Sequence, residues 1–213
     1  MVIATGCAWR KDGVGRHNHR PIPGWDAASV FTPEDVMAGR ALADPVILFD
    51  DDDYYLGGVL AEKLRRDGHR VMLITPSSLV SAWTQFTLEQ EKIQKRLIEL
   101  EVGIVANHNL ARVGAGHVEL ACVFTDRIAR HEAGSVVMVT ARLPNDGLYR
   151  ELMAAPDALG KAGIKSVTRI GDCLAPGMIA HAVYSGHRHA RELDAPPAAD
   201  LSFRPEPLDL SPL

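Results

Sequence analysis

Short apolar runs alternate with amphipathic segments along most of the chain, which predicts alternating strands and helices. Residues Val46–Phe49 and Val71–Ile74 are apolar and rich in β-branched side chains, as buried strands are. Between these runs, apolar residues recur at helical spacing from Leu56 to Leu64, and Gly68 follows as a stop signal. The order strand, turn, helix, strand is typical of the first half of a dinucleotide-binding unit.

The same pattern extends on both sides of this unit. Thr32 and Pro33 open a predicted helix that stops at Gly39, and a capping box at Thr87–Gln90 opens another. Residues 7–31 are polar and rich in Gly, Pro and His, so we expect a connecting loop there. Further strands are expected at Val2–Ala4, Val102–Val105, Val118–Phe124, Arg127–Arg130, Val136–Thr140 and Ser166–Ile170, and further helices at Leu148–Ala154 and Pro176–Leu193.

Strands that alternate with helices predict an α/β fold with a mainly parallel sheet. The last three strands before residue 141 are expected to form a β-meander. Two strand-to-glycine turns bracket this middle part, at Gly6 and at Gly171. A middle domain inserted between two pieces of another domain explains both turns. Because the chain opens inside a predicted strand, we also expect it to be cut from a longer polypeptide.

Composition narrows the possible function classes. The chain has 213 residues, 46% of them hydrophobic, and a net charge of −4, which argues against a nucleic-acid partner. No apolar run reaches the roughly 18 residues of a membrane span and no signal peptide is recognisable, so we expect a cytoplasmic protein. The three cysteines lie far apart, so we expect neither a zinc nor an iron–sulfur site within the chain.

The turn after the first strand of the dinucleotide-type unit carries four consecutive aspartates, Asp50–Asp53, where a phosphate-binding loop needs glycines. Acids near a helix N-terminus favour the helix dipole by about 0.3–1 kcal/mol each, so we expect a helix capped by its own acids, without a bound nucleotide. A hard-cation site built from the four carboxylates is the alternative. The second strand ends in Thr75-Pro76, without the acid or arginine that a ribose or a 2′-phosphate requires. NAD(P) binding is therefore not expected.

Two further groups of residues are candidates for function. Gly171-Asp172 follows a strand and precedes a helix, which is a ligand-binding position in open α/β sheets or an ordinary turn with a helix cap. Both interpretations stay open. Histidines occur in two stretches, and we interpret them as surface or hydrogen-bonding residues rather than metal ligands. They are His17, His19, His181, His187 and His189. No nucleophile and base have a recognisable local context, so no catalytic residue is assigned.

Several segments, taken in order, carry a family resemblance. They include VIATGCAWRKDGVGR, TPEDVMAG, DDDYYLGGVLAEKL, VSAWTQFTLEQEKIQKRLIEL, VMVTARLPN and IGDCLAPGMIAHAVYSGHRHAREL. From residue 2 to about residue 194 the chain resembles the C-terminal region of the trimethylamine, dimethylamine and histamine dehydrogenases, in the NADH:flavin oxidoreductase superfamily. The resemblance implies that residues 14–143 are a Rossmann-like NAD(P)-binding-type domain, a parallel sheet with helices plus a β-meander. This domain is then inserted into a partial FAD/ADP-binding-type domain, formed by residues 1–13 and 144–194, and residues 195–213 are a Pro-rich tail.

The resemblance also implies a parent enzyme and its cofactors. In that family an upstream TIM barrel carries FMN and a four-iron four-sulfur cluster. It oxidises a small N-methyl or primary amine and passes electrons to an electron-transferring flavoprotein. By resemblance, this chain is a non-catalytic part of such an enzyme, and the parent polypeptide is a homodimer. ADP-type contacts are implied for Ala4, Thr5, Gly6, Gly171 and Asp172.

The chain departs from the family pattern in one segment, and two alternative functions stay open. Thr140-Ala141-Arg142 stands where the family has a Thr-Gly-Arg variant, so close approach of a nucleotide is not expected there. The first alternative is the NAD(P)H-binding domain of a flavin oxidoreductase of the dienoyl-CoA reductase type. That role needs glycines near Asp51 and Asp53 and an arginine or acid near Thr75. The second alternative is a freestanding docking module, which requires that the protein truly begins at Met1.

Overall fold

The computed structural model describes residues 1–125 and 127–193, and they divide into two compact units. One unit consists of Met1–Gly6 together with the described residues from Asp146 on, and the other consists of Cys7–Asn145. The expected Pro-rich tail, residues 195–213, lies outside the described residues. Among the described helices, none combines the length and the apolar character needed to cross a bilayer.

The unit Cys7–Asn145 is built on a five-stranded sheet in which every neighbouring pair is parallel. The strand order across the sheet is β3-β10-β4-β5-β6. The strands are β3 (Val30–Phe31), β10 (Ser135–Val139), β4 (Val46–Asp50), β5 (Val71–Ile74) and β6 (Gly103–Val105). This arrangement confirms the predicted α/β fold with a mainly parallel sheet.

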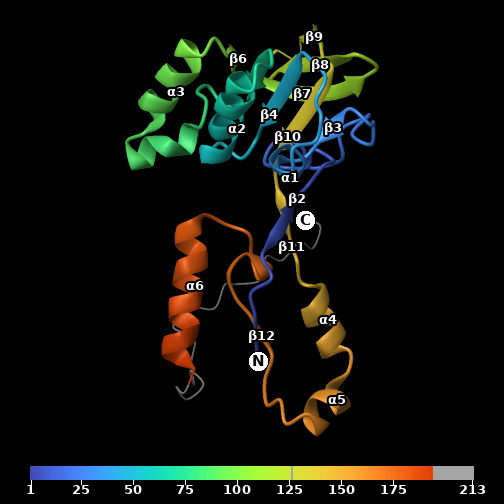
Figure 1. Cartoon of the computed structure of the whole chain (residues 1–213), viewed down its shortest axis with the longest axis vertical. Helices are drawn as coiled ribbons and strands as arrows, with labels where there is room; N and C mark the ends of the chain where they lie inside the picture. The colour runs from blue at the N-terminus through green and yellow to red at the C-terminus, as the bar shows by residue number, and fades with distance from the viewer. Residues whose placement is uncertain (126, 194–213) are drawn as a thin grey trace, which may run out of the picture. The chain divides into compact units, whose positions relative to one another are not determined.

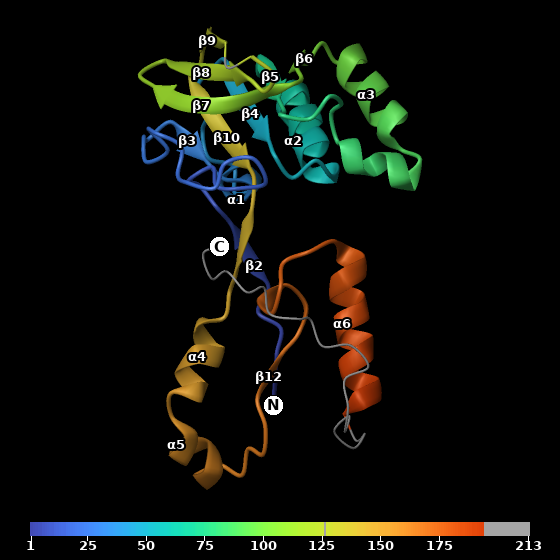
Figure 2. The same ribbon diagram turned by 180° about the vertical axis from the view of Figure 1, so that it is seen from behind.

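Both faces of the parallel sheet are covered, and alternate residues of each central strand enter different cores. From β4, Val46 and Leu48 pack against helices on one face, while Ile47 and Phe49 pack on the other face. The helices are α1 (Pro33–Met37), α2 (Tyr55–Arg66) and α3 (Gln90–Glu99). A small antiparallel sheet covers the opposite face (Figure 1 and Figure 2). Burial on both faces explains why these strands read as continuous apolar runs.

The antiparallel sheet is a β-meander, but its strands differ from those expected. It consists of β7 (His108–Gly114), β8 (His117–Cys122) and β9 (Ile128–Glu132). The prediction that Val136–Thr140 belongs to the meander is wrong, because β10 lies between β3 and β4 in the parallel sheet. The meander strand that sequence reasoning missed is β7, whose register shifts between Leu110 and Arg112. That irregularity disturbs the alternation by which a half-buried strand is recognised.

Helix capping confirms one expectation and corrects another. Thr32 caps α1 in a reciprocal capping box with Asp35, as the sequence indicates for the start of this helix. The capping box expected at Thr87–Gln90 is wrong. Thr87 instead ends the 3-10 helix η1 (Ala82–Thr87), where its hydroxyl donates to the Thr84 carbonyl oxygen at 3.0 Å. The threonine hydroxyl therefore bonds within η1, and α3 begins after Glu89 without a side-chain cap.

The polar segment 7–31 is more ordered than a connecting loop. It contains β3 and also β2 (Cys7–Trp9), which pairs with β11 (Arg142–Pro144) in an antiparallel ladder. The backbone N–H of Trp9 donates to Glu34 Oε1 at 2.9 Å, and the Arg142 guanidinium stacks on the Trp9 ring at 5.0 Å. These partners lie far away in sequence, so local composition does not reveal them.

The other unit contains two short parallel strands and three helices. β1 (Val2–Ile3) pairs with β12 (Thr168–Arg169). The helices are α4 (Gly147–Met153), α5 (Pro156–Lys161) and α6 (Ile179–Glu192), of which α5 was not expected from the sequence. None of these three helices contains a buried residue among those the structure describes. Parallel sheets normally have several strands and both faces covered, whereas the parallel sheet described in this unit has two strands.

Gly134→Ala should destabilise the unit Cys7–Asn145. A methyl group on Gly134 would overlap the carbonyl oxygens of Ala43 and Asp44, which are backbone atoms and cannot rotate away. Overpacking of this kind costs about 1–3 kcal/mol. Urea unfolding measures the loss, and Gly103→Ala in β6 of the same unit is the control, because a methyl group there meets only ordinary contacts at 3.6 Å and beyond. Equal stability of the Gly134 variant and the wild-type chain would contradict this assignment.

Candidate functional site

The candidate site lies at the carboxyl edge of the parallel sheet, where β4 and β10 end side by side. The chain leaves β4 toward β5, while β10 lies on the other side of β4. This is a switch point in the strand order, the position at which open α/β sheets bind ligands. The backbone N–H of Asp51 donates to the Val139 carbonyl oxygen at 2.8 Å, so the aspartate loop begins directly at this point.

Asp50, the last residue of β4, is completely buried. Its Oδ1 accepts hydrogen bonds from the backbone N–H groups of Asp52 and Asp53, both at 3.1 Å. Its Oδ2 has no hydrogen-bond partner among the described residues. Burial, together with the nearby charge of Asp53, raises the pKa of Asp50 well above its usual range. The carboxyl group thus accepts the hydrogen bonds of the loop that an external anion would otherwise accept.

Asp51 is also buried, and its partners come from the polar segment near the start of the chain. The backbone N–H of His17 donates to Asp51 Oδ2 at 3.0 Å, and the imidazole Nδ1 lies 2.6 Å from Oδ1. The backbone of Gly15 passes so close that a side chain there would overlap this carboxylate and crowd Thr140. Thr140 is buried, and its hydroxyl has no partner among the described residues.

His17 is therefore a hydrogen-bonding residue, as the sequence interpretation expected. Sequence reasoning found no carboxylate for it because the partner, Asp51, is 34 residues away. No local signal identifies such a pair.

Asp53 connects the loop to the end of β5. Its backbone is in the left-handed region, with φ of 60°. Thr75 Oγ1 donates to Asp53 Oδ1 at 3.2 Å, and Ser77 Oγ donates to Oδ2 at 2.8 Å. The position at which a cofactor ribose would be recognised is thus engaged by the protein's own carboxylate.

Asp52 is the least buried of the four acids, and two arginines counteract the effect of burial on its pKa. Desolvation raises its pKa, while the charges of Arg142 and Arg16 act in the opposite direction. The Arg16 guanidinium also lies 5.2 Å from the centre of the Trp83 ring. The negative charge of Asp52 therefore lies near two cations of its own unit.

These contacts correct the expected role of the four aspartates. The prediction that they cap the following helix is wrong, because α2 begins after Tyr54 without a side-chain cap and has no acid in its first turn. The buried end of β4 instead draws three carboxylates inward, where burial requires each to find donors. Within the part of the chain that the structure describes, no group of histidine, cysteine and acidic residues is arranged to hold a metal ion. The alternative cation site is therefore not supported.

In the other unit, the structure brings the two predicted glycine turns together. Because β1 and β12 are parallel neighbours, the residues after their carboxyl ends lie at one edge. Ala4-Thr5-Gly6 follows β1, and the 3-10 helix η2 (Gly171–Cys173) follows β12. The Thr5 hydroxyl donates to Cys173 Sγ at 3.2 Å. Sequence reasoning did not foresee Cys173 as a member of this group.

The glycines of this edge have the backbone geometry of close-approach positions. Gly6 and Gly171 have φ of 75° and 61°, and no atom lies within 4 Å of a Cβ placed on Gly6. The backbone N–H of Gly171 donates to Ser185 Oγ at 3.0 Å, and Asp172 Oδ1 accepts from the Gly177 N–H at 3.1 Å. Asp172 thus closes the turn before α6 without being its N-cap, which is Met178. Nucleotide binding by these residues stays a prediction.

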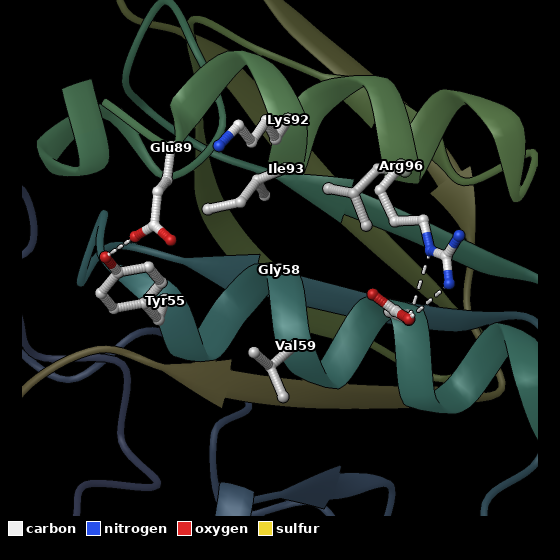
Figure 3. Close-up of a pocket in the computed structure, with 9 residues that line it drawn as sticks. Tyr55, Gly58, Val59, Glu89, Lys92, Ile93 and Arg96 are labelled. Carbon is white, nitrogen blue, oxygen red and sulfur yellow. Dashed lines mark hydrogen bonds and ion pairs between the residues drawn. The ribbon is translucent and has the colours of Figure 1, made fainter. Parts of the chain in front are cut away.

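A separate groove of about 220 Å³ lies between α2 and α3 (Figure 3). Val59 and Ile93 contribute apolar surface to it. At one end the Tyr55 hydroxyl donates to Glu89, and at the other Arg96 is paired with Glu62 at 3.3 Å. These polar contacts tie the two helices together. None of the residues singled out as cofactor contacts lines this groove.

Asp50→Asn should remove a pH-dependent loss of stability. The raised pKa of Asp50 means that the folded chain keeps this proton to higher pH than the unfolded chain does. The stability linked to it is complete below about pH 4 and is lost as pH rises through the folded pKa. The amide has no proton to lose, so the variant should gain stability relative to wild type as pH rises.

Urea unfolding of both chains between about pH 4 and pH 8 measures this difference. Asp26→Asn is the control, since Asp26 is exposed. A stability difference that stays constant over this range would contradict the protonated, buried state of Asp50.

Comparison with known proteins identifies the family. The model of the OYE-like second alpha/beta domain matches residues 31–144. Dimethylamine dehydrogenase from Hyphomicrobium sp. (strain x) is 36% identical over 228 aligned residues, which cover 97% of this chain and 31% of the relative. The structure of histamine dehydrogenase from Rhizobium sp. 4-9 is 44% identical with a TM-score of 0.89, covering 99% of this chain and 33% of that one.

A 6-hydroxypseudooxynicotine amine oxidase from Pseudomonas geniculata N1 is 40% identical, with a TM-score of 0.82 over 88% of this chain and 28% of its own. A ferredoxin reductase from Rhodopseudomonas palustris, 17% identical with a TM-score of 0.54, shares only the fold. The chain spans about a third of the length of the dimethylamine and histamine dehydrogenases. The predicted resemblance is confirmed: the chain belongs to the family of OYE-like second alpha/beta domains and is homologous to a region of these two amine dehydrogenases.

Proposed function

We propose that this chain is the nucleotide-binding-like, non-catalytic region of a flavin amine dehydrogenase that oxidises a small N-methyl or primary amine. The observation that carries the proposal is identity of 36% and 44% over nearly the whole chain to dimethylamine and histamine dehydrogenases. The parent polypeptide would hold FMN and a four-iron four-sulfur cluster in an upstream barrel and pass electrons to an electron-transferring flavoprotein. It would act as a homodimer.

The unit Cys7–Asn145 would be the inserted domain of NAD(P)-binding type, with residues 14–143 as its main part. Its strand order and the glycines of α2 support this origin. Its present residues do not fit a dinucleotide, because the Asp50 carboxyl occupies the turn and Asp53 engages the end of β5. In this proposal the unit has a structural role and delivers no hydride.

The other unit would belong to an FAD/ADP-binding-type domain formed by residues 1–13 and 144–194, of which residues 7–13 and 144–145 lie in the Cys7–Asn145 unit. The two-stranded parallel sheet and the helices without buried residues support a partial domain. The open backbone at Gly6 fits an approaching diphosphate. Ala4, Thr5, Gly171 and Asp172 would complete the ADP site, with the Gly171 and Asp172 turn held by the protein's own hydrogen bonds.

The isolated chain should neither reduce a redox dye when given dimethylamine or histamine nor bind NADPH saturably. The reason is that no described cluster of cysteines or acids assembles a redox centre and that the phosphate turn is filled by Asp50. Dye reduction and NADPH fluorescence titration measure the two activities. Amine-dependent dye reduction would overturn the proposed role. Saturable NADPH binding would favour a hydride-delivering domain of the dienoyl-CoA reductase type.

Gly6→Asn should weaken ADP binding by at least about tenfold, which is roughly 1.4 kcal/mol. Asparagine tolerates the left-handed backbone of Gly6, so the change adds a side chain to the open space without forcing a new fold. Isothermal titration with ADP measures the affinity. The matched control is Gly68→Asn in the other unit, where φ is also positive and no atom lies within 4 Å of a Cβ. Undetectable binding to the wild-type chain, or equal weakening by both variants, would contradict the ADP site.

A further inference from the structure

We infer that the turn before α3 carries a docking surface for the part of the parent polypeptide that lies outside this chain. Trp83, Phe86 and Leu88 form this surface, the η1 patch. The inference rests on the proposed function, since it names the place at which the Cys7–Asn145 unit would attach to the rest of an amine dehydrogenase.

The three side chains of the η1 patch are large, apolar and exposed to solvent. Phe86 and Leu88 are 80% and 86% exposed, and Trp83 is 45% exposed. The Trp83 and Phe86 rings pack on one another, with 5.4 Å between their centroids, so these two form one continuous surface. Single exposed apolar side chains are ordinary on a protein surface, whereas a group of them marks a contact with another surface.

The backbone under the η1 patch is fixed to its surroundings by hydrogen bonds. Thr84 is completely buried, and its hydroxyl donates to a carbonyl oxygen of the same turn at 2.7 Å. The Trp83 N–H donates to the Asp53 carbonyl oxygen at 2.9 Å, and the Tyr55 hydroxyl donates to Glu89 just after the patch (Figure 3). The turn is thus tied to the aspartate loop and to α2, and it presents its apolar side chains in an ordered form. Such preorganisation lowers the entropy cost of binding.

The residue that ends η1 has an unusual backbone for its type. Leu88 has φ of 60°, and a left-handed residue at a helix end is normally glycine or asparagine. Side chains other than glycine adopt this conformation at a cost of about 1–3 kcal/mol. Because Leu88 is exposed, packing among the described residues does not offset this cost. A contact outside the chain would use the leucine side chain that this position displays.

The size of the relatives argues for the occupant of the patch. The chain aligns over 97% and 99% of its length with the dimethylamine and histamine dehydrogenases, yet it covers only 31% and 33% of theirs. In the proposed parent, about two thirds of the polypeptide therefore lies outside this chain. Domains of one polypeptide contact each other through interfaces of about 600–1,500 Å².

The area and composition of the patch also fit a contact within one polypeptide. At about 150–250 Å² for a large side chain, three of them offer less than the roughly 800 Å² that each partner contributes to a stable contact between separate proteins. A covalently linked domain needs less area, because its linker keeps it at a high effective concentration. The Arg16 guanidinium lies 5.2 Å from the centre of the Trp83 ring, and tryptophan and arginine are the residue types enriched at binding hot spots. The occupant that fits is an apolar protein surface of the same polypeptide.

Photo-cross-linking in the full-length native protein tests the occupant. The variant is Leu88→p-benzoylphenylalanine, which places the reactive group at an exposed position and leaves the buried contacts of the turn unchanged. We expect a product that keeps the mass of one polypeptide on a denaturing gel and whose cross-linked peptide lies outside the 213 residues of this chain. A product of doubled mass would reveal a second copy, and another larger product would reveal a separate protein. Either of these, a cross-link within the 213 residues, or no product at all would overturn the inference.

Hydroxyl-radical footprinting gives a second readout with a matched control. Phe86 and Phe124 belong to the same unit and are 80% and 79% exposed, so their rings should be oxidised at similar rates in the isolated chain. In the full-length protein Phe86 should react at least about fivefold more slowly, because a docked surface removes a central ring from water, while Phe124 keeps its rate. An unchanged Phe86 rate, or equal slowing of both rings, would contradict the docking surface. A native polypeptide no longer than these 213 residues would instead reject the proposed function, so the two failures are distinguishable.

Discussion

The end of β4 is the constraint on which the Cys7–Asn145 unit depends. A strand buried on both faces delivers acidic side chains into the interior, and buried carboxyl groups require donors or a proton. One oxygen of Asp50 accepts from the loop that this residue starts, Asp51 accepts from the polar segment near the chain's beginning, and Asp53 accepts from the end of the neighbouring strand. Three separate parts of the unit are thereby fixed to one point.

In this arrangement, protein side chains hold together the elements that would otherwise surround a ligand. In a dinucleotide-binding domain the glycine turn, the first strand and the second strand meet around the cofactor. Here the same three elements meet around side chains of the protein. The unit can therefore keep its architecture without a bound nucleotide. This arrangement agrees with the proposed role as a non-catalytic region of a larger amine dehydrogenase.

The two units differ in how many of their described residues are buried. The Cys7–Asn145 unit has a five-stranded sheet covered on both faces and two large cores. The other unit has two paired strands and helices that bury none of their described residues. Its glycine turns nevertheless meet at one edge, joined by the contact between Thr5 and Cys173. This contact agrees with the proposed role of the two glycine turns in binding a nucleotide.

Local sequence by itself determined the strands β4 and β5, the helix α2 between them, the Thr32 cap, the α/β class and the family resemblance. Each of these depends on residues close in the chain, whose spacing encodes burial and helix ends. Only the tertiary structure decided the place of β10 in the parallel sheet and the partners of Asp51 and Asp53. The side-chain partners of these two aspartates lie 34 and 22 residues away in sequence. A carboxylate's role follows from the donors that surround it in space, and no local pattern encodes them.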